Sequence, residues 1–278
     1  KTLNLKTMKT KFFALSIALI SLASCKKEGC TDPKAANYNE KAKKDNGNCI
    51  YTPTPVTIEF EHTVDGAALQ FNQMIYTSAA GNKYSVQTLK YFISDITIEG
   101  SGETQDVLID AEFYVDAEDA STLIKESVAS LPAGEYSGVS FRWGLSKEKN
   151  TSGRFPNPPE SNMEWPAMMG GGYHFMKLEG QYDSLATGNI KYYNTHIGNP
   201  SSDYDNSFVV SFSEPFTVKG DEEIHITINM EINNWYQNPH TYDFNNYDDG
   251  IMGNQTVQQM LKENGQTDVF SIKEIHAH

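Results

Sequence analysis

The sequence predicts an all-β protein, an antiparallel β-sandwich with long loops and one or two marginal helices. Short runs that alternate apolar with polar side chains recur along the chain, and β-branched and aromatic residues dominate them. Gly, Asn, Asp and Pro separate these runs at a spacing typical of sandwiches. No repeat period and no alternation of strands with helices is present. These three observations favour two packed antiparallel sheets.

The expected strands and helices all follow residue 55, so residues 56–278 are predicted to form one sandwich domain. The expected strands are 56–62, 90–100, 111–116, 134–145, 172–180, 190–198, 207–218 and 222–236. Helical patterns occur near 120–129 and in 256–265, where Gly265 would be the C-terminal stop. With 38% hydrophobic residues, the chain can build a core.

Residues 1–25 are typical of a lipoprotein signal peptide. Lys9 and Lys11 precede the apolar run 12–22, which is too short to span about 30 Å of hydrocarbon. Small residues then lead to Cys25, and cleavage before Cys25 would free its thiol for lipidation. We therefore expect an exported protein in the cell envelope, anchored by lipid at the periplasmic face or the cell surface.

Residues 26–55 read as a polar spacer that ends in a proline-containing linker. Cys30 and Cys49 are the two cysteines left after lipidation of Cys25, and an oxidising compartment favours a disulfide between them. The closed loop of about 20 residues would stabilise the fold by about 3 kcal/mol. A metal site at this pair is disfavoured because no histidine lies beside it.

The charge balance disfavours nucleic acid as a partner. Removal of residues 1–25 would leave 18 basic residues against 36 acidic ones, a net charge of −18. Binding to nucleic acid requires a basic surface. An acidic surface attracts cations, although it also serves solubility alone. No GxSxG, HExxH, GxGxxG or Walker motif is present, so we expect a protein that is not an enzyme.

Two histidines in neighbouring strand patterns suggest a metal site. His174, Met176 and Leu178 alternate onto one face of the first pattern. A hairpin across the loop 181–189 in symmetric register would place His174 opposite His196, with Cβ atoms about 4.5–5.5 Å apart. Two imidazoles at that spacing can hold one ion. A slip of one residue would turn one histidine to the other face.

Methionines near these histidines favour copper. Met163, Met168, Met169 and Met176 lie within a short segment around Trp165. Imidazole and thioether together suit copper, whereas calcium and magnesium prefer oxygen. The alternative is that these methionines fill gaps in the core.

The remaining histidines are weaker candidates. His62, at the end of the first strand, is a third possible ligand, or else a strand-end histidine bonded to backbone. His225 alternates with isoleucines and is expected to face solvent, and His240 follows a proline in a loop. His276 and His278 have a spacing that could chelate, but chain ends fray.

The sequence resembles the MbnP-like copper-binding domain, a β-sandwich family of exported bacterial proteins. The resemblance runs from about Val56 to Ile272. It rests on "NKYSVQTLKYFISDI", then "GYHFMKLEG", then "HIG", in that order. It implies copper held by histidines, matching His62 and His196 here, and a di-haem partner of the peroxidase type that oxidises a tryptophan, matching Trp165. Many members carry a second tryptophan where Ala167 stands.

Together these patterns predict a membrane-anchored lipoprotein that binds copper through His62, His174 and His196, with Met176 as a soft neighbour. Its role would be copper uptake, storage or handling rather than turnover. The alternative is a surface adhesion module that holds a glycan or a protein with aromatic residues such as Trp235 and Tyr236, the histidines being structural.

Overall fold

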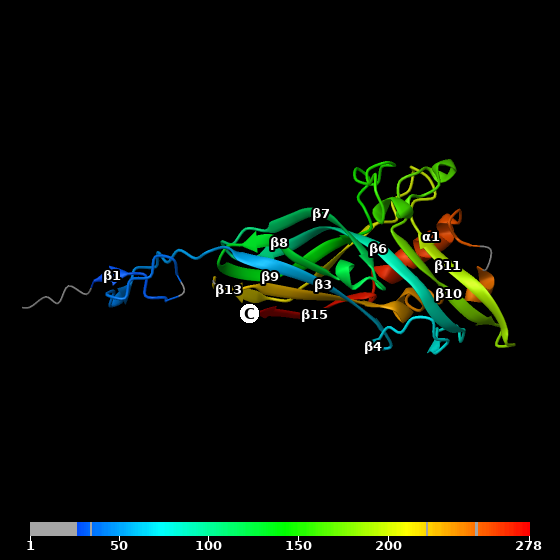
Figure 1. Ribbon diagram of the computed structural model, residues 1–278, viewed down its shortest axis with the longest axis horizontal. Coiled ribbons are helices and arrows are strands. Elements are labelled where there is room, and N and C mark those ends of the chain that lie inside the picture. Colours follow the sequence, from blue (N-terminus) through cyan, green and yellow to red (C-terminus); the bar gives the residue numbers. More distant parts are fainter. Residues whose placement is uncertain (1–26, 34, 221, 248–249) are drawn as a thin grey trace, which may run out of the picture.

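The computed structural model describes residues 27–33, 35–220, 222–247 and 250–278. The predicted signal peptide and Cys25 lie outside these residues. The described chain forms an elongated β-sandwich, with a small N-terminal module at one end and a lobe of loops above the other (Figure 1). Among the described residues, no helix has the length and apolar character needed to cross a bilayer.

Two sheets make up the sandwich, as predicted. The eight-stranded sheet has the order β11-β10-β6-β9-β12, with β5 and β7 paired to β6 and β13 paired to β9. Its strands are β5 (Tyr76–Thr77), β6 (Lys83–Gly100), β7 (Val107–Asp116), β9 (Gly134–Trp143), β10 (Met176–Ser184), β11 (Asn189–Ile197), β12 (Phe208–Phe212) and β13 (Phe216–Val218).

The five-stranded sheet has the order β15-β14-β3-β4, with β8 paired to β3. Its strands are β3 (Thr54–Val64), β4 (Ala67–Ala68), β8 (Ile124–Leu131), β14 (Ile224–Glu231) and β15 (Phe270–Ala277). Pairs in both sheets are antiparallel except β3 with β14, which run parallel. Parallel neighbours need a long connection, and here the whole eight-stranded sheet intervenes in the sequence.

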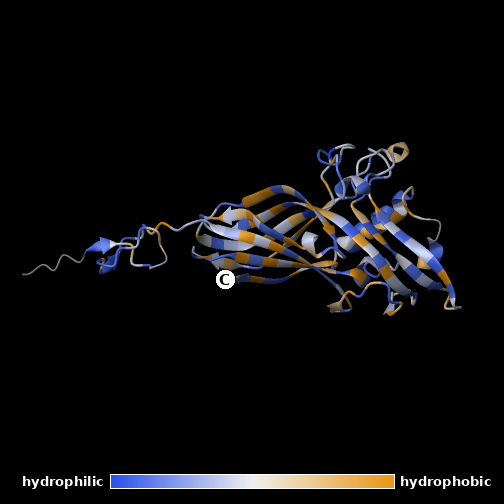
Figure 2. Cartoon of the chain, viewed as in Figure 1, coloured by the Kyte–Doolittle hydropathy of each residue, from blue (hydrophilic) through white to orange (hydrophobic). Residues whose placement is uncertain are grey.

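The core lies between the sheets, because apolar residues alternate along the strands that face each other (Figure 2). In β3, Ile58 and Phe60 are fully buried, and the ring of Phe60 meets Tyr91 of β6 edge-on with centroids 6.3 Å apart. Phe141 of β9 meets Phe270 of β15 in the same way. Each large apolar side chain buried here contributes about 1.5–3 kcal/mol.

The prediction of a helix near 120–129 is wrong. This segment forms a short 3-10 turn, η1 (Ala120–Thr122), capped by the Asp119 side chain, and then strand β8. Pairing of β8 with β3 along the sheet edge outweighs a weak local helical preference. Strands β8 and β15 were not expected, and the expected strand 207–218 is divided into β12 and β13.

The second expected helix is present as α1 (Gln255–Gly265), which begins at an Asn254 cap. Gly265 is its last residue and does not have the left-handed backbone of a glycine stop. A Cβ at Gly265 would lie 2.5 Å from Cζ of Phe208 and 2.6 Å from Cζ3 of Trp235. The glycine is therefore required by close packing.

The expected strand 222–236 ends at Glu231 and continues as the 3-10 turn η4 (Ile232–Tyr236). Three further short 3-10 turns lie in the loops, namely η2 (Glu160–Met163), η3 (Ala167–Met169) and η5 (Phe244–Asn246). Turns η2 and η3 belong to the lobe, which the segment around residues 150–172 forms together with the segment around 199–204 (Figure 1).

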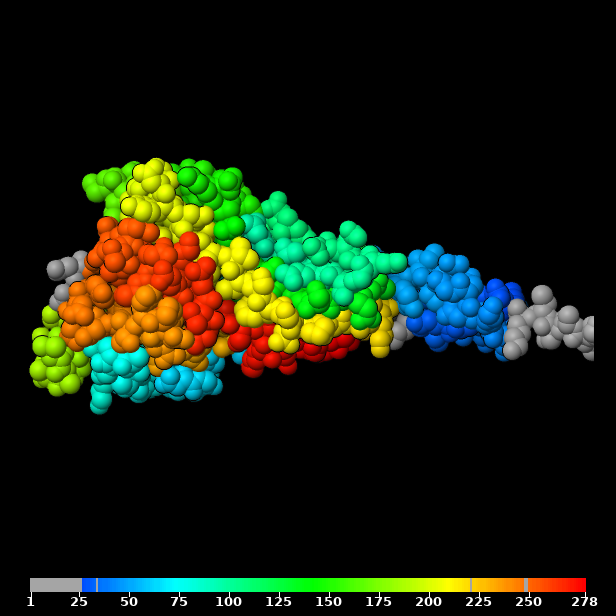
Figure 3. All heavy atoms as spheres, turned by 180° about the vertical axis from the view of Figure 1, so that it is seen from behind, coloured from blue at the N-terminus to red at the C-terminus, as the bar shows by residue number. Residues whose placement is uncertain are grey.

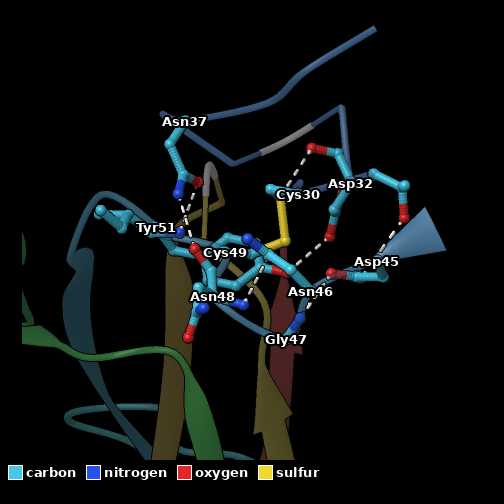
Figure 4. The surroundings of a disulfide bond; sticks show 11 residues. Cys30, Asp32, Asn37, Asp45, Asn46, Gly47, Asn48, Cys49 and Tyr51 are labelled. Carbon is cyan, nitrogen blue, oxygen red and sulfur yellow. Dashed lines mark hydrogen bonds between the residues drawn. A yellow bond between two sulfur atoms is a disulfide. The ribbon is translucent and has the colours of Figure 1, made fainter. Parts of the chain in front are cut away.

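The N-terminal module is held by the predicted disulfide between Cys30 and Cys49 (Figure 4). It adds one small parallel pair, β1 (Glu28–Gly29) with β2 (Lys44–Asp45). The hydroxyl of Tyr51 donates to Asp32 at 2.8 Å, and the Tyr51 ring lies against Gly220 of the sandwich. The module projects as a separate knob in the space-filling view (Figure 3). It extends the molecule without adding to the main core.

Candidate metal centre

The predicted hairpin exists, but its register differs from the symmetric one. β10 pairs with β11 so that Gly180 lies opposite Tyr193 and Lys177 lies opposite His196. The turn is tighter than the expected loop 181–189, because Ser184 and Asn189 still pair across it. Leu185 and Ala186 adopt positive φ there, which suits a tight hairpin turn. His174 is therefore not the strand partner of His196.

His174 and His196 nevertheless meet. His174 precedes β10 and is drawn out of the ladder, since its backbone N–H donates to the carbonyl of Met163 at 2.7 Å. Its ring lies perpendicular to that of His196, with centroids 4.9 Å apart. His174 is 5% exposed, and the His196 side chain is 16% exposed. The pair borders the lobe, because His174 bonds to Met163 of η2, and the His196 side chain is partly exposed.

Each ring of the pair is fixed through one nitrogen. Nδ1 of His174 donates to the Met163 carbonyl oxygen at 2.9 Å. Nε2 of His196 lies 2.7 Å from Oε1 of Glu179, and since a carboxylate only accepts, this nitrogen carries the proton. Each ring then keeps a second nitrogen with a lone pair. Second partners of this kind, a carbonyl and a carboxylate, are those that orient histidines in metal sites.

Electrostatics favours the neutral, ligating form of His174. Burial lowers the pKa of His174 from 6.5 to about 3, so its imidazole is neutral well below neutral pH. The hydrogen bond from His196 lowers the pKa of the Glu179 carboxyl, which keeps it ionised as an acceptor. A neutral imidazole beside a carboxylate-bound imidazole is a donor set suited to copper or zinc.

The spacing also fits a shared ion. A metal–nitrogen bond of about 2.0–2.1 Å places a ligating ring centroid about 3 Å from the ion, so two rings at a tetrahedral angle have centroids about 5 Å apart. The observed 4.9 Å agrees with this geometry. The distance between the two rings is therefore compatible with a shared ion.

Trp165 forms one wall of the site. Its indole lies against the His174 ring, with centroids 4.6 Å apart, and it is 2% exposed. The indole also packs against Gly198, since a Cβ on this glycine would lie 2.7 Å from Cε3 of the indole. Within the described part of the chain, the buried Nε1 of Trp165 has no hydrogen-bond partner.

The glycine run and α1 position these residues. Gly170, Gly171 and Gly172 all have positive φ, which glycine adopts without strain. The carbonyl of Gly172 accepts from the backbone N–H of Trp165 at 2.8 Å. From α1, the buried Gln258 side chain donates to the His196 carbonyl at 2.8 Å and accepts from the Gly198 N–H at 3.1 Å.

The structure places His62 apart from this pair. His62 lies on β3, and its Nε2 is 3.0 Å from the hydroxyl of Tyr91. Burial lowers the pKa of His62 to about 4. It lines a separate groove with Glu59 and Glu61 of the same strand and with Leu69 and Phe71 of the segment after β4. Among the described residues, no group of three or more candidate ligands within 4.8 Å of one another contains His62, His174 or His196.

Sheet alternation explains the separation. Met176 lies opposite Tyr91 and Ile197, whereas its neighbour Lys177 lies opposite His196. Paired residues project from the same face, and neighbours along a strand from opposite faces. Met176 therefore points into the core on the side of Tyr91 and His62, and His196 points outward. The expectation that His62 and Met176 join His174 and His196 around one ion is not met.

The other methionines do not gather around the pair as a set. Met163 is buried and contributes its carbonyl, whereas Met168 is 93% exposed. Met169 reaches toward Gly253. Sequence reasoning did not identify Glu179, although its place two residues from Lys177 on the strand put it on the same face as that residue.

A comparison with protein families identifies the family of this chain. The MbnP family model matches residues 53–255. The chain belongs to the MbnP family. Among solved structures, "MbnP from Methylosinus trichosporium" matches with a TM-score of 0.45 and 14% identity, over 70% of this chain and 80% of that chain. A comparison with curated proteins found no match.

Within this MbnP-family sandwich, the two aromatic residues considered for glycan binding are not exposed on the surface. Trp235 and Tyr236 are both fully buried, and Tyr236 contacts Thr195 through its hydroxyl at 3.1 Å. The expectation that these two residues contact a glycan or a protein is wrong. Their aromatic character reflects the core, where Trp235 lies 4.9 Å from Trp143 between ring centroids.

Proposed function

We propose that this MbnP-family protein binds copper through His174 and His196 and serves copper uptake, storage or handling rather than turnover. The observation that carries the proposal is the pair of imidazoles 4.9 Å apart, each fixed through one nitrogen. Family membership supports the choice of copper. Two imidazoles suit it without thioether ligands.

The test is titration of the purified protein with Cu⁺, kept reduced by ascorbate, in competition with a colorimetric chelator. His174→Ala and His196→Ala should each weaken binding by tenfold or more, because each removes one of two ligands. His240→Ala is the matched control. His240 contacts Glu263 rather than His174 or His196, and its side chain is 40% exposed. It should bind as the unchanged protein does.

The variant His62→Ala distinguishes two possible positions of the ion, the His174–His196 pair and the groove that His62 lines. If copper is held by His174 and His196, this variant retains binding. Loss of binding in His62→Ala together with retention in His174→Ala and His196→Ala would overturn the proposal and move the ion to the groove beside Tyr91.

We propose further that the protein is lipid-anchored through Cys25 in the cell envelope. The basic and apolar segments before Cys25 support this. Cys25→Ser should release the protein from the membrane fraction into the soluble fraction of the cell envelope. Retention of the variant in membranes would contradict a lipid anchor.

Trp165 remains our candidate for oxidation by a di-haem partner of the peroxidase type. Its contact with His174 supports the choice, because an oxidised side chain there would border the copper pair. Peptide mass spectrometry of protein from its own cells should show added mass on the Trp165 peptide. An unmodified peptide in copper-loaded protein would contradict this assignment.

A further inference from the structure

A second group of histidines lies on the opposite sheet. His225 of β14 and His276 of β15 are strand partners, and His278 follows two residues later. β15 is the edge strand of the five-stranded sheet, and it lies on the surface in the rear view (Figure 3). Ile224 and Ile226 point into the core, so His225 points outward.

The three rings converge. The His225 and His276 rings are stacked with centroids 5.1 Å apart, and the His276 and His278 rings are 4.4 Å apart. Nε2 of His276 lies 2.7 Å from Nε2 of His278. One nitrogen from each of the three residues lies within 4.8 Å of the others, the only such group of histidines, cysteines or carboxylates in the described ranges.

The end of the strand is held in place. The N–H of His278 donates to the Glu223 carbonyl at 3.0 Å, and the Glu223 N–H donates to the His278 carbonyl at 3.3 Å. The expectation that this segment frays is therefore not met. Pairing with β14 fixes the backbone beneath His276 and His278, as a specific site requires.

We propose that His225, His276 and His278 form a second metal site, which takes a divalent transition-metal ion of the class that prefers imidazole. Two nitrogens on a tetrahedral ion lie about 3.3 Å apart. The longest separation must therefore shorten by at most about 1.5 Å, which side-chain rotation at the surface can supply. Three imidazoles without a thiolate or thioether select Zn²⁺ or Cu²⁺ over Ca²⁺ and Mg²⁺.

Neighbouring carboxylates complete the site. Oε2 of Glu59, on β3, lies 3.0 Å from Nε2 of His225. While Nε2 keeps this bond, Nδ1 of His225 is the ligating nitrogen, and Glu59 orients the ring as carboxylates do in zinc sites. Oε2 of Glu274 lies 3.8 Å from Nδ1 of His276. These negative charges offset the charge of a divalent ion.

This site is independent of the copper pair. His174 and His196 belong to the β10–β11 side of the eight-stranded sheet, whereas the three histidines lie on the outer face of the five-stranded sheet. No residue is shared between them. A negative result at the His174–His196 pair would therefore not affect the proposed site at His225, His276 and His278.

Isothermal titration with Zn²⁺ tests the proposal in a His174→Ala/His196→Ala background, which removes the copper pair. We expect one Zn²⁺ bound per chain in that background. Adding His276→Ala/His278→Ala should abolish binding, and adding His225→Ala should weaken it by tenfold or more. His240→Ala is the matched control and should leave it unchanged. Equal Zn²⁺ binding with and without the three histidines would overturn the proposal.

A second measurement needs no substitution. Diethyl pyrocarbonate modifies free imidazole nitrogen, so Zn²⁺ should protect His276 and His278 from modification in the unchanged protein while His240 still reacts. Peptide mass spectrometry reads each histidine separately. Equal modification of His276 and His278 with and without saturating Zn²⁺ would also overturn the site.

Discussion

The indole of Trp165 lies so close to Gly198 that a Cβ on Gly198 would be 2.7 Å from Cε3 and from Cζ3 of the ring. Gly198 follows His196 by two residues, and Trp165 contacts the ring of His174. The glycine of "HIG" and the tryptophan are therefore parts of one contact, and that contact forms a wall beside the His174–His196 pair.

Gly198→Ala should displace the Trp165 indole and destabilise the fold by about 1–3 kcal/mol, as overpacking does in buried sites. Urea unfolding measures the stability change, and tryptophan fluorescence reports the environment of Trp165. Gly253→Ala is the control, because a Cβ there meets only Met169 Cε at 3.6 Å. Equal stability of the two variants would show that the indole can move aside freely.

Glu179→Gln should weaken copper binding by about 10- to 100-fold, the usual cost of losing a carboxylate that orients a histidine ligand. The amide still reaches His196 but carries no charge. Chelator competition measures the affinity, and circular dichroism checks the fold. Glu214→Gln, an exposed carboxylate in the loop after β12, is the control. Unchanged affinity in Glu179→Gln would remove Glu179 from the site.

The free energy of unfolding should decrease as the pH is lowered from about 6.5 toward 4. Burial lowers the pKa of His62 to about 4 and that of His174 to about 3, while the unfolded chain takes up protons at the ordinary 6.5. In this window the unfolded state binds more protons, so acid favours unfolding. Each histidine contributes a slope of about 1.4 kcal/mol per pH unit at most.

Urea unfolding between pH 4.5 and 7.5 measures this slope. His62→Gln and His174→Gln should each flatten it. A slope that stays the same in both buried variants would mean that other groups cause the acid sensitivity.

Gly265→Ala should destabilise the protein even though alanine is the better helix former. The added Cβ would meet Phe208 at 2.5 Å and Trp235 at 2.6 Å, and overpacking costs about 1–3 kcal/mol against a helical gain of about 1 kcal/mol. Thermal unfolding measures the result. Gly265→Asn separates packing from capping, because asparagine is tolerated at a left-handed cap but is larger still. A stable Asn variant would restore the interpretation of Gly265 as a cap.

Local patterns in the sequence determined the class of the fold and most of its elements. Alternation of apolar and polar residues predicted strands such as β3, β7 and β11, and the helical pattern in 256–265 predicted α1. Cys30 and Cys49 are the two cysteines left after Cys25, and this predicted the disulfide. These features depend on neighbours along the chain, so the sequence carries them directly.

Tertiary structure alone decided which histidines meet. The turn at Leu185 and Ala186 shifted the β10–β11 register, and a contact with Met163 then brought His174 back to His196. Packing of the two sheets placed His62 beside Tyr91, and pairing of β14 with β15 brought His225, His276 and His278 together. Register and sheet order depend on long-range pairing and packing, which a pattern with a period of two residues does not encode.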